Sequence, residues 1–255
     1  MTEARGPVEG AAGADRGTET QSRRGNPVPE PRVTTMFDSI APVYDRMNTL
    51  MTVGLDGRWR RAAVRAAGLQ KGGTALDVAC GTGKLTAALA EAVGPGGRVV
   101  GIDLSPVMLD QARRAFGELP GVEFRLGNAM ALPVPDASFD AATIAFGLRN
   151  LSSFEAGLSE MARTVRSGGR VVCLELSVPR PRIMGRVYSG AFRVMAPVVG
   201  ALFRRRAAYS YLPHSLDGFP AAEEIAATMR KAGLRGVTFK RLAMGAAALH
   251  VGTVA

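Results

Sequence analysis

Two apolar segments of the chain end in residues that could hold a nucleotide-type cofactor. Residues 76–83 read LDVACGTG and end in a glycine turn, whereas residues 101–105 read GIDLS and carry one acid, Asp103. Because Gly81 and Gly83 lack a Cβ atom, their backbone can lie directly against a ligand. Asp103 could accept two hydrogen bonds from a ribose diol, the usual role of an acid after the second strand of a nucleotide-binding fold. The spacing predicts a cofactor site at one edge of a parallel sheet.

The glycine turn also favours one class of cofactor. A dinucleotide fingerprint needs a third glycine, which allows tight packing of helix on strand. Here Thr86 occupies that position, and Asp77 begins the motif. The pattern resembles S-adenosylmethionine (SAM) methyltransferases more than NAD enzymes, and this resemblance implies that Asp77 lies near the methionine end of SAM. The alternative, a tight turn followed by a solvated acid, leaves the spacing of Asp103 unexplained.

The elements that must position these residues alternate between strand and helix. Apolar segments predict strands over residues 74–79, 98–103, 122–126, 140–144, 170–176, 237–242 and 247–254, and a helix over residues 220–231. Ser105 and Pro106 predict a helix start, and Gly168 with Gly169 predicts a left-handed helix end. We therefore expect an α/β fold, a doubly wound, mostly parallel, Rossmann-like sheet of seven strands. Its ligands bind at the carboxyl ends of the strands.

Length and composition are those of one enzyme domain. The chain has 255 residues, of which 47% are hydrophobic, so it can bury a full core. Residues 1–32 contain almost no large apolar side chains, and we expect them to form a disordered tail before a domain over residues 33–255. This tail has no apolar stretch typical of a signal peptide. Cys80 and Cys173 are expected to be unpaired in a reducing, cytoplasmic compartment.

Motifs far from the glycine turn resemble one methyltransferase family. Residues 146–150 read FGLRN, residues 44–48 read YDRMN and residues 209–212 read YSYL. These motifs are similar to those of the ubiquinone/menaquinone biosynthesis C-methyltransferases, the UbiE/MenG family, and the resemblance covers residues 33–255. It implies a class I SAM-dependent methyltransferase that methylates a ring carbon of a reduced prenylated quinone, most simply demethylmenaquinol. The residues implied to bind SAM are Asp77, Gly81, Thr82, Gly83, Asp103, Asn128, Ala129 and Ala145, the last at a place where family members often carry serine.

Three residues are candidates for catalysis: Arg149, Tyr44 and His214. A guanidinium at the rim of the site would favour a phenolate by lowering the pKa of the phenol. The alternative role of Arg149 is a salt bridge to an acid such as Asp45 or Glu175. Tyr44 could close over the cofactor or be a core aromatic. The few histidines and cysteines are widely separated, so no metal site is expected.

Two departures from the family pattern concern Asp56 and His214. Family members tend to carry a histidine at the first position and a glutamate at the second. We hypothesise that Asp56 and His214 face each other as an exchanged pair; two independent changes are the alternative. These departures leave open a divergent paralogue that methylates another phenolic or small-molecule substrate.

The positive charge is concentrated in one segment. The net charge is +10, and residues 178–208 hold seven arginines and no acid, interleaved with apolar residues. The segment is too short and too interrupted for a membrane span, but it suits an amphipathic lid, over about residues 178–218, on the inner face of the plasma membrane. A lid packed on the core, or on a second subunit of a homodimer, is the alternative. With only 6% aromatic residues and no visible RNA-binding module, nucleic acid is not an expected partner, and a non-catalytic SAM- or nucleic-acid-binding protein is the least favoured reading.

Overall fold

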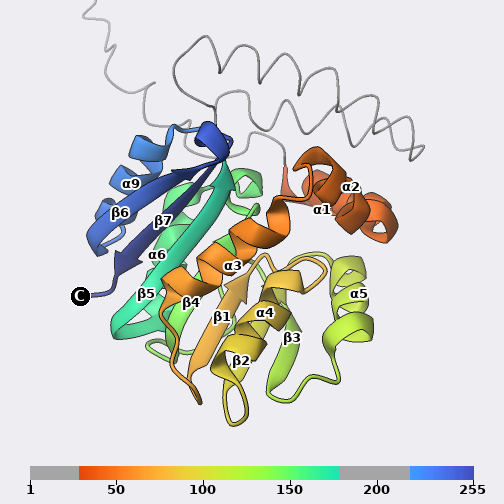
Figure 1. Ribbon diagram of the computed structural model, residues 1–255, viewed down its shortest axis with the longest axis horizontal. Helices are drawn as coiled ribbons and strands as arrows, with labels where there is room; N and C mark the ends of the chain where they lie inside the picture. The colour runs from red at the N-terminus through yellow and green to blue at the C-terminus, as the bar shows by residue number, and fades with distance from the viewer. Residues whose placement is uncertain (1–28, 178–218) are drawn as a thin grey trace, which may run out of the picture.

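A seven-stranded sheet forms the centre of the computed structural model, which describes residues 29–177 and 219–255 (Figure 1). Its strand order is β3-β2-β1-β4-β5-β7-β6. The first five strands are parallel, and β7 is antiparallel to both of its neighbours. The strands are β1 (Thr74–Val78), β2 (Arg98–Asp103), β3 (Val122–Leu126), β4 (Phe139–Ala145), β5 (Val165–Leu176), β6 (Arg235–Leu242) and β7 (Ala247–Thr253). The prediction of a doubly wound, mostly parallel sheet is confirmed.

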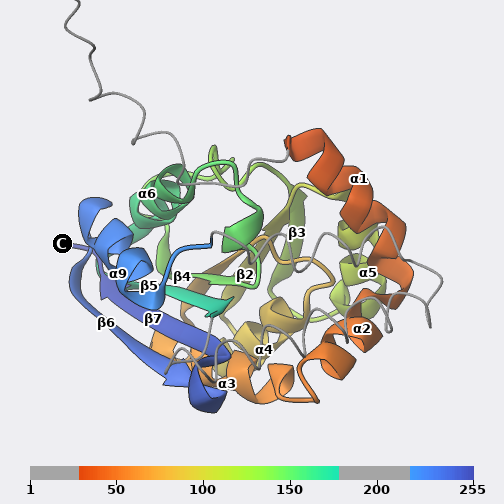
Figure 2. The same ribbon diagram turned by 90° about the horizontal axis from the view of Figure 1, so that it is seen from above.

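Helices cover both faces of this sheet. The helices are α1 (Glu30–Ile40), α2 (Tyr44–Met51), α3 (Asp56–Ala67), α4 (Lys84–Val93), α5 (Pro106–Phe116), α6 (Phe154–Thr164) and α9 (Ala222–Lys231). Short 3-10 turns are η1 (Ala41–Val43), η2 (Leu148–Asn150) and η3 (Ala243–Gly245). Helices α3, α4 and α5 pack on one face, and α6 and α9 pack on the other. Seen from above, α1 and α2 lie at the carboxyl end of the sheet (Figure 2). None of the described helices has both the length and the apolar character needed to cross a membrane.

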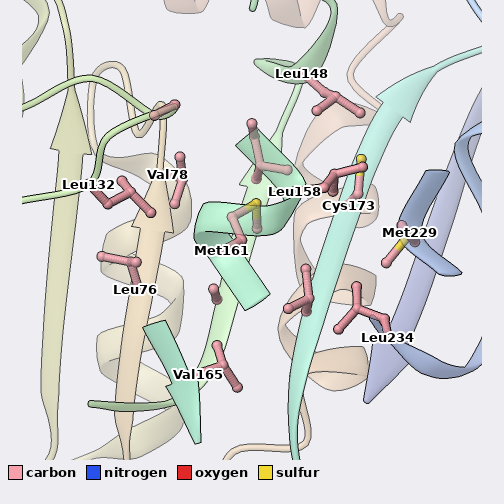
Figure 3. Close-up of a cluster of buried hydrophobic side chains, with 14 of the residues drawn as sticks. Leu76, Val78, Leu132, Leu148, Leu158, Met161, Val165, Cys173, Met229 and Leu234 are labelled. Carbon is pink, nitrogen blue, oxygen red and sulfur yellow. The ribbon is translucent and has the colours of Figure 1, made fainter. Parts of the chain in front are cut away.

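Successive side chains along each strand point to opposite faces of the sheet, and each face has its own layer of hydrophobic core. Leu76 and Val78 of β1 meet Leu158 and Met161 of α6 in one layer (Figure 3). In the other layer, Ala75 of β1 packs with residues of α3 and α4. Each fully buried leucine contributes about 1.5–3 kcal/mol relative to an exposed one. The two layers fix the carboxyl ends of the strands, and thereby the loops that follow them.

The chain changes direction at β1. It moves outward from β1 to β2 and β3, and then returns to β4 on the other side of β1. The loops after β1 and β4 therefore leave in opposite directions, which opens a crevice at the carboxyl ends where ligands bind in such sheets. Every predicted cofactor residue lies at or next to these ends.

Two expectations about element boundaries are wrong. Helix α1 begins at Glu30, so residues 30–32 are not part of a disordered tail; the Glu30 carboxylate is held there by Asn128 and Ser152. Helix α6 ends at Thr164, where Val165 already has extended backbone, so Gly168 and Gly169 do not end a helix.

The Gly168-Gly169 pair instead permits an irregular stretch of β5. Gly168 has φ 78° there, and a Cβ on Gly169 would lie 2.6 Å from the carbonyl oxygen of Asp140. The register between β4 and β5 shifts at this point. The glycines are required by the close approach of two strands at a bulge.

Candidate functional site

Gly81 and Gly83 have different structural roles in the glycine turn. Gly81 has φ 55°, and the nearest atom to a Cβ there would be Cε1 of Tyr44 at 3.9 Å, so its backbone faces open space. Gly83 has φ 82° and directly precedes α4, which begins at Lys84. A Cβ on Gly83 would lie 2.9 Å from Cζ of Phe124, and Gly83 is not among the described residues that line the cavities below. Gly81 is thus exposed to a ligand, whereas Gly83 allows the turn to pack.

Asp103 joins the loops that follow β1 and β2. One carboxylate oxygen accepts from the backbone N–H of Gly81 at 2.8 Å, and the other accepts from that of Ser105 at 2.9 Å. Each oxygen keeps a lone pair, so the carboxylate can still accept two hydroxyl donors. Burial raises the pKa of Asp103, and the backbone donors oppose this rise. Ser105 also caps α5, as predicted, by accepting from the N–H of Met108 at 3.0 Å.

A cleft opens beside Asp103, and the space in and directly above it, open solvent included, is about 760 Å³. The carboxyl-terminal ends of β1 to β4 and helix α1 all contribute to its wall. We call it the adenosine cleft. Its lining includes Glu30, Phe37, Tyr44, Gly81, Asp103, Met108, Asn128, Ala129, Ala145, Phe146 and Asn150. The wall is mostly apolar with a few polar groups, a composition that suits a purine and a ribose.

Asn128 lines this cleft, and its side chain is fixed by two contacts. Its Oδ1 accepts from the N–H of Met130 at 2.9 Å, and its Nδ2 donates to Glu30 at 3.0 Å. The neighbouring Ala129 is buried. The second Glu30 oxygen accepts from the hydroxyl of Ser152 at 2.9 Å. Glu30 therefore connects α1 to the loops after β3 and β4.

Two further carboxylates connect the N-terminal helices to the cofactor loops. Asp38 of α1 accepts from the hydroxyl of Ser105, and Asp45 of α2 accepts from that of Thr82 at 2.9 Å. We refer to Glu30, Asp38 and Asp45 as the helix carboxylates. Together they attach α1 and α2 to the loops after all of the first four strands.

A smaller cavity continues from the glycine turn and contains most of the ionisable groups. It is lined by Tyr44, Arg60, Asp77, Cys80, Gly81, Thr82, Lys84 and Ala145, among others. We call it the methionine cavity, because Asp77 lies in it. Tyr44, Gly81 and Ala145 line both cavities, so the two spaces are contiguous.

Asp77 is almost completely buried. Its carboxylate accepts from the hydroxyls of Thr86 at 2.7 Å and Thr143 at 3.0 Å. Burial raises the pKa of Asp77 to about 7, and these two hydrogen bonds limit the rise. Such a carboxylate gains a proton readily unless a cation lies beside it. The α-ammonium group of a methionine moiety would be a suitable cation.

Backbone strain gathers where β1 and β4 end. Ala79 has φ 52° and Phe146 has φ 60°, in the left-handed region that residues with a side chain rarely adopt. A Cβ on Gly147 would lie 2.7 Å from Cβ of Ala79. The glycine of the FGLRN motif is thus needed because these two loops touch at the junction of the cavities.

Arg149 forms a salt bridge to an acid, the role that the sequence analysis gave as the alternative to catalysis. Its guanidinium forms an ion pair with Glu175, and its backbone N–H donates to the other Glu175 oxygen at 3.2 Å. Both side chains are nearly inaccessible, at 5% and 1% exposure. Arg149 is not among the described residues that line either cavity, although its neighbour Asn150 is. A catalytic role for Arg149 stays a prediction.

Tyr44 lies where the adenosine cleft and the methionine cavity meet. Its ring packs edge-on against Phe37, with ring centroids 5.9 Å apart. Burial raises the pKa of the Tyr44 hydroxyl, whereas the positive charges of Arg149 and Arg60 lower it. The structure thus places Tyr44 at the cofactor site, and its catalytic role stays a prediction.

His214 and the expected lid over residues 178–218 lie outside the described residues. The hypothesis that Asp56 pairs with His214 therefore stays untested. Asp56 itself is buried and forms an ion pair with Arg60 of the same helix.

The sequence patterns missed Glu30 and Arg60. Glu30 falls in a segment that its composition assigns to a tail, and Arg60 is one of several arginines in α3. Only Arg60 among the buried residues of α3 combines a full positive charge with a place in the wall of the methionine cavity. The helical spacing of Trp59, Ala63 and Ala67, which marks the core side of α3, was the available signal, because Arg60 directly follows Trp59 on that side.

The residues present fit SAM. Asp103 offers two acceptors for a ribose diol, Gly81 offers open backbone, and Asn128 and Ala129 line the adenosine cleft. The methionine cavity offers Asp77 for an ammonium group. Ala145 lines both cavities, and the expectation that it lacks a side-chain hydrogen bond to SAM stays a prediction.

Comparison with known proteins agrees with this assignment. A sequence model of the ubiE/COQ5 methyltransferase family matches residues 26–254. A demethylmenaquinone methyltransferase of Thermus thermophilus is 45% identical over 220 residues, covering 85% of this chain and 99% of the relative. A ubiquinone/menaquinone biosynthesis C-methyltransferase UbiE of Geobacter sulfurreducens is 41% identical, covering 87% of this chain and 88% of the relative.

Among solved structures, a SAM-dependent methyltransferase of Thermotoga maritima superposes with a TM-score of 0.63 at 22% identity. That match covers 87% of this chain and 99% of the other. A SAM-dependent methyltransferase of Aquifex aeolicus gives a TM-score of 0.58 at 19% identity, covering 77% of this chain and 89% of the other. At this level of identity the likeness concerns the fold alone.

Proposed function

Because the chain belongs to the ubiE/COQ5 methyltransferase family, we propose that it methylates a ring carbon of a reduced prenylated quinone, converting demethylmenaquinol to menaquinol. The observation that carries this proposal is the similarity to demethylmenaquinone methyltransferases, at 42–45% identity over nearly the whole length of those proteins. The chain is accordingly a SAM-dependent enzyme.

When bound, SAM supplies a methyl group made electrophilic by the sulfonium. The chain's own task is to hold donor and acceptor in line and to exclude water. Asp103 would hold the ribose, and the loops after β3 and β4 would enclose the adenine. The helix carboxylates hold α1 and α2 against these loops. The two helices thereby form one wall of the adenosine cleft.

The acceptor carbon becomes nucleophilic when a neighbouring phenol loses its proton. We assign to Arg149 the stabilisation of the resulting phenolate, because its positive charge already lowers the pKa of the Tyr44 hydroxyl at the junction of the cavities. Glu175 fixes the guanidinium in position. Tyr44 would border the reacting atoms.

The alternative of a divergent paralogue has lost part of its support. Asp56, one of the two departures from the family pattern, has a structural role in the ion pair with Arg60. The other departure, His214, lies outside the described residues. A membrane-surface contact through residues 178–208 stays a prediction that suits a substrate with an isoprenoid tail.

A methyl-transfer assay with labelled SAM tests the proposed function. Demethylmenaquinol under reducing conditions should become labelled at rates well above those of unprenylated phenols and RNA. Preferred labelling of an unprenylated phenol would favour the paralogue. SAM binding without labelling of any acceptor would favour a non-catalytic SAM-binding protein.

A further inference from the structure

We propose that Arg60 is the receptor for the α-carboxylate of the cofactor's methionine moiety. The proposal rests on the assignment of the chain as a SAM-dependent methyltransferase and assigns to that site a residue that the sequence patterns missed. Arg60 belongs to α3, which precedes the glycine turn, and its side chain lines the methionine cavity together with Asp77 and Thr82.

The position of the Arg60 guanidinium is fixed from two sides. Asp56, one helical turn earlier, forms an ion pair with it, and the hydroxyl of Thr52 donates to the other Asp56 oxygen at 3.3 Å. The guanidinium also lies 5.4 Å from the centre of the Phe146 ring. The Arg60 side chain is only 11% exposed. A cation held in this way loses little further freedom when an anion binds.

The donor geometry of Arg60 leaves room for a second carboxylate. A guanidinium carries five N–H donors in a planar fork that matches a carboxylate. The ion pair with Asp56 engages the Nη1 atom. The remaining donors can therefore serve a ligand without breaking the Asp56 contact.

The charges of the methionine cavity match a zwitterion. Asp77 and Arg60 line the same cavity, where Asp77 can accept from an ammonium group and the positive charge of Arg60 lowers the pKa of Asp77. An amino-acid moiety carries both charges on one carbon atom. A cavity lined by one buried acid and one buried guanidinium suits such a group, because each offers the opposite charge to one end of the zwitterion.

Lys84 is the competing cation in the same cavity. Its ammonium group lies 3.5 Å from the Asp45 carboxylate, and both side chains are about one-third exposed, at 36% and 35%. A solvent-exposed lysine holds an anion weakly. The buried and preorganised Arg60 is the better receptor, and Lys84 supplies a matched control.

The test compares two ligands that differ only in the carboxylate. Binding of S-adenosylhomocysteine and of its decarboxylated analogue is measured by calorimetry for the wild type, Arg60→Met and Lys84→Met. The wild type should prefer the carboxylated ligand by about 10- to 100-fold, the size of one or two charge-assisted hydrogen bonds. In Arg60→Met this preference should disappear, while the affinity for the decarboxylated analogue stays within about threefold of wild type. Lys84→Met should keep the preference.

An unchanged preference in Arg60→Met, or a preference lost in Lys84→Met, would overturn the proposal. Arg60→Met leaves the buried Asp56 carboxylate without its cation, which can destabilise the protein. The two ligands are therefore also compared in the double variant Asp56→Asn/Arg60→Met, which has no unpaired carboxylate at this position. Neither ligand needs a quinol acceptor, so the outcome is independent of the acceptor assigned above. Absence of S-adenosylhomocysteine binding in the wild type would instead refute the cofactor assignment and this proposal together.

Discussion

Arg149 and Glu175 form an ion pair that is buried between η2 and the end of β5. The residue that the FGLRN motif predicts to act in catalysis is therefore also structural. Removing the guanidinium leaves a buried carboxylate without its counter-charge, which in proteins costs about 3–5 kcal/mol of stability.

A double replacement can separate the structural role of Arg149 from its catalytic role. Arg149→Met alone should lower the free energy of unfolding by about 3–5 kcal/mol, whereas Arg149→Met/Glu175→Gln should recover much of this loss. The recovered variant should bind S-adenosylhomocysteine nearly as the wild type does and yet turn over far more slowly. Denaturant unfolding, calorimetry and methyl transfer measure the three quantities. Full turnover in the double variant would remove Arg149 from the mechanism.

Replacing Asp103 should weaken cofactor binding. The side chain offers two charged acceptors to the ribose, each worth about 1.5–3 kcal/mol, so Asp103→Ala should raise the dissociation constant of S-adenosylhomocysteine by roughly 10- to 100-fold for each hydrogen bond lost. Because Asp103 also accepts from Gly81 and Ser105, the unfolding transition must be compared at the same time. Wild-type affinity in a folded Asp103→Ala variant would show that the ribose is held elsewhere.

Asp77 should make cofactor binding depend on pH. Its pKa is about 7 in the folded protein and near 3.9 in the unfolded chain, so between these values the folded state holds the extra proton. Stability should therefore fall as pH rises from about 4 to about 7, by at most about 1.4 kcal/mol per pH unit from this group. A bound ammonium group favours the ionised carboxylate, so affinity should rise over the same range.

Calorimetry in buffers of different ionisation enthalpy can count the protons released. Binding at pH 6 should release up to one proton, and this release should vanish towards pH 9. Asp77→Asn should abolish it, which distinguishes Asp77 from Asp103, another buried acid with a raised pKa. Proton release that persists in Asp77→Asn would assign the titration to another group.

Gly147→Ala should destabilise the junction of the two cavities. The new Cβ atom would lie 2.7 Å from Cβ of Ala79, a backbone-fixed neighbour that cannot rotate away. Such overpacking costs about 1–3 kcal/mol. Gly57→Ala in α3 is the control, because the nearest atom there is the tip of Arg61 at 3.7 Å. Equal melting temperatures for both variants would argue against the close approach of the two loops.

Glu30→Gln should speed cofactor release. The substitution keeps the size of the side chain but removes its charge, so the contact with Asn128 is no longer charge-assisted and the contact with Ser152 must reverse its direction. A charge-assisted contact is worth about 1.5–3 kcal/mol, so dissociation of S-adenosylhomocysteine should accelerate several-fold or more. Stopped-flow fluorescence measures this rate, with Glu91→Gln on the distant part of α4 as control. An unchanged rate would show that α1 does not limit release.

Local patterns in the sequence predict most of this fold, because the signals involved are local. The alternating β and α segments, the Ser105 cap and the start of α4 at Lys84 all depend on neighbouring residues. Gly168 and Gly169 show the limit of such patterns. A glycine pair after a helix resembles a helix end, but the constraint here comes from Asp140 on another strand.

The cofactor-binding residues could also be predicted from local signals in the sequence. The ion pairs and hydrogen bonds between distant elements could not. Asp77, Gly81 and Asp103 lie at strand ends that the apolar pattern locates. The sequence allowed either Asp45 or Glu175 as the ion-pair partner of Arg149. Only the completed sheet determines that Glu175 lies next to it. Glu30 could not be found from composition, because its side-chain contacts with Asn128 and Ser152 form only when α1 lies over the finished site.

The helix carboxylates have a consequence for how the site responds to solution conditions. Glu30 and Asp38 bind an amide and two hydroxyls rather than cations. Ionic strength screens contacts between charges, but it has little effect on a carboxylate that accepts from a neutral donor. The contacts of Glu30 and Asp38 should therefore persist in concentrated salt, so that the part of the cofactor cover they hold in place should change little with ionic strength.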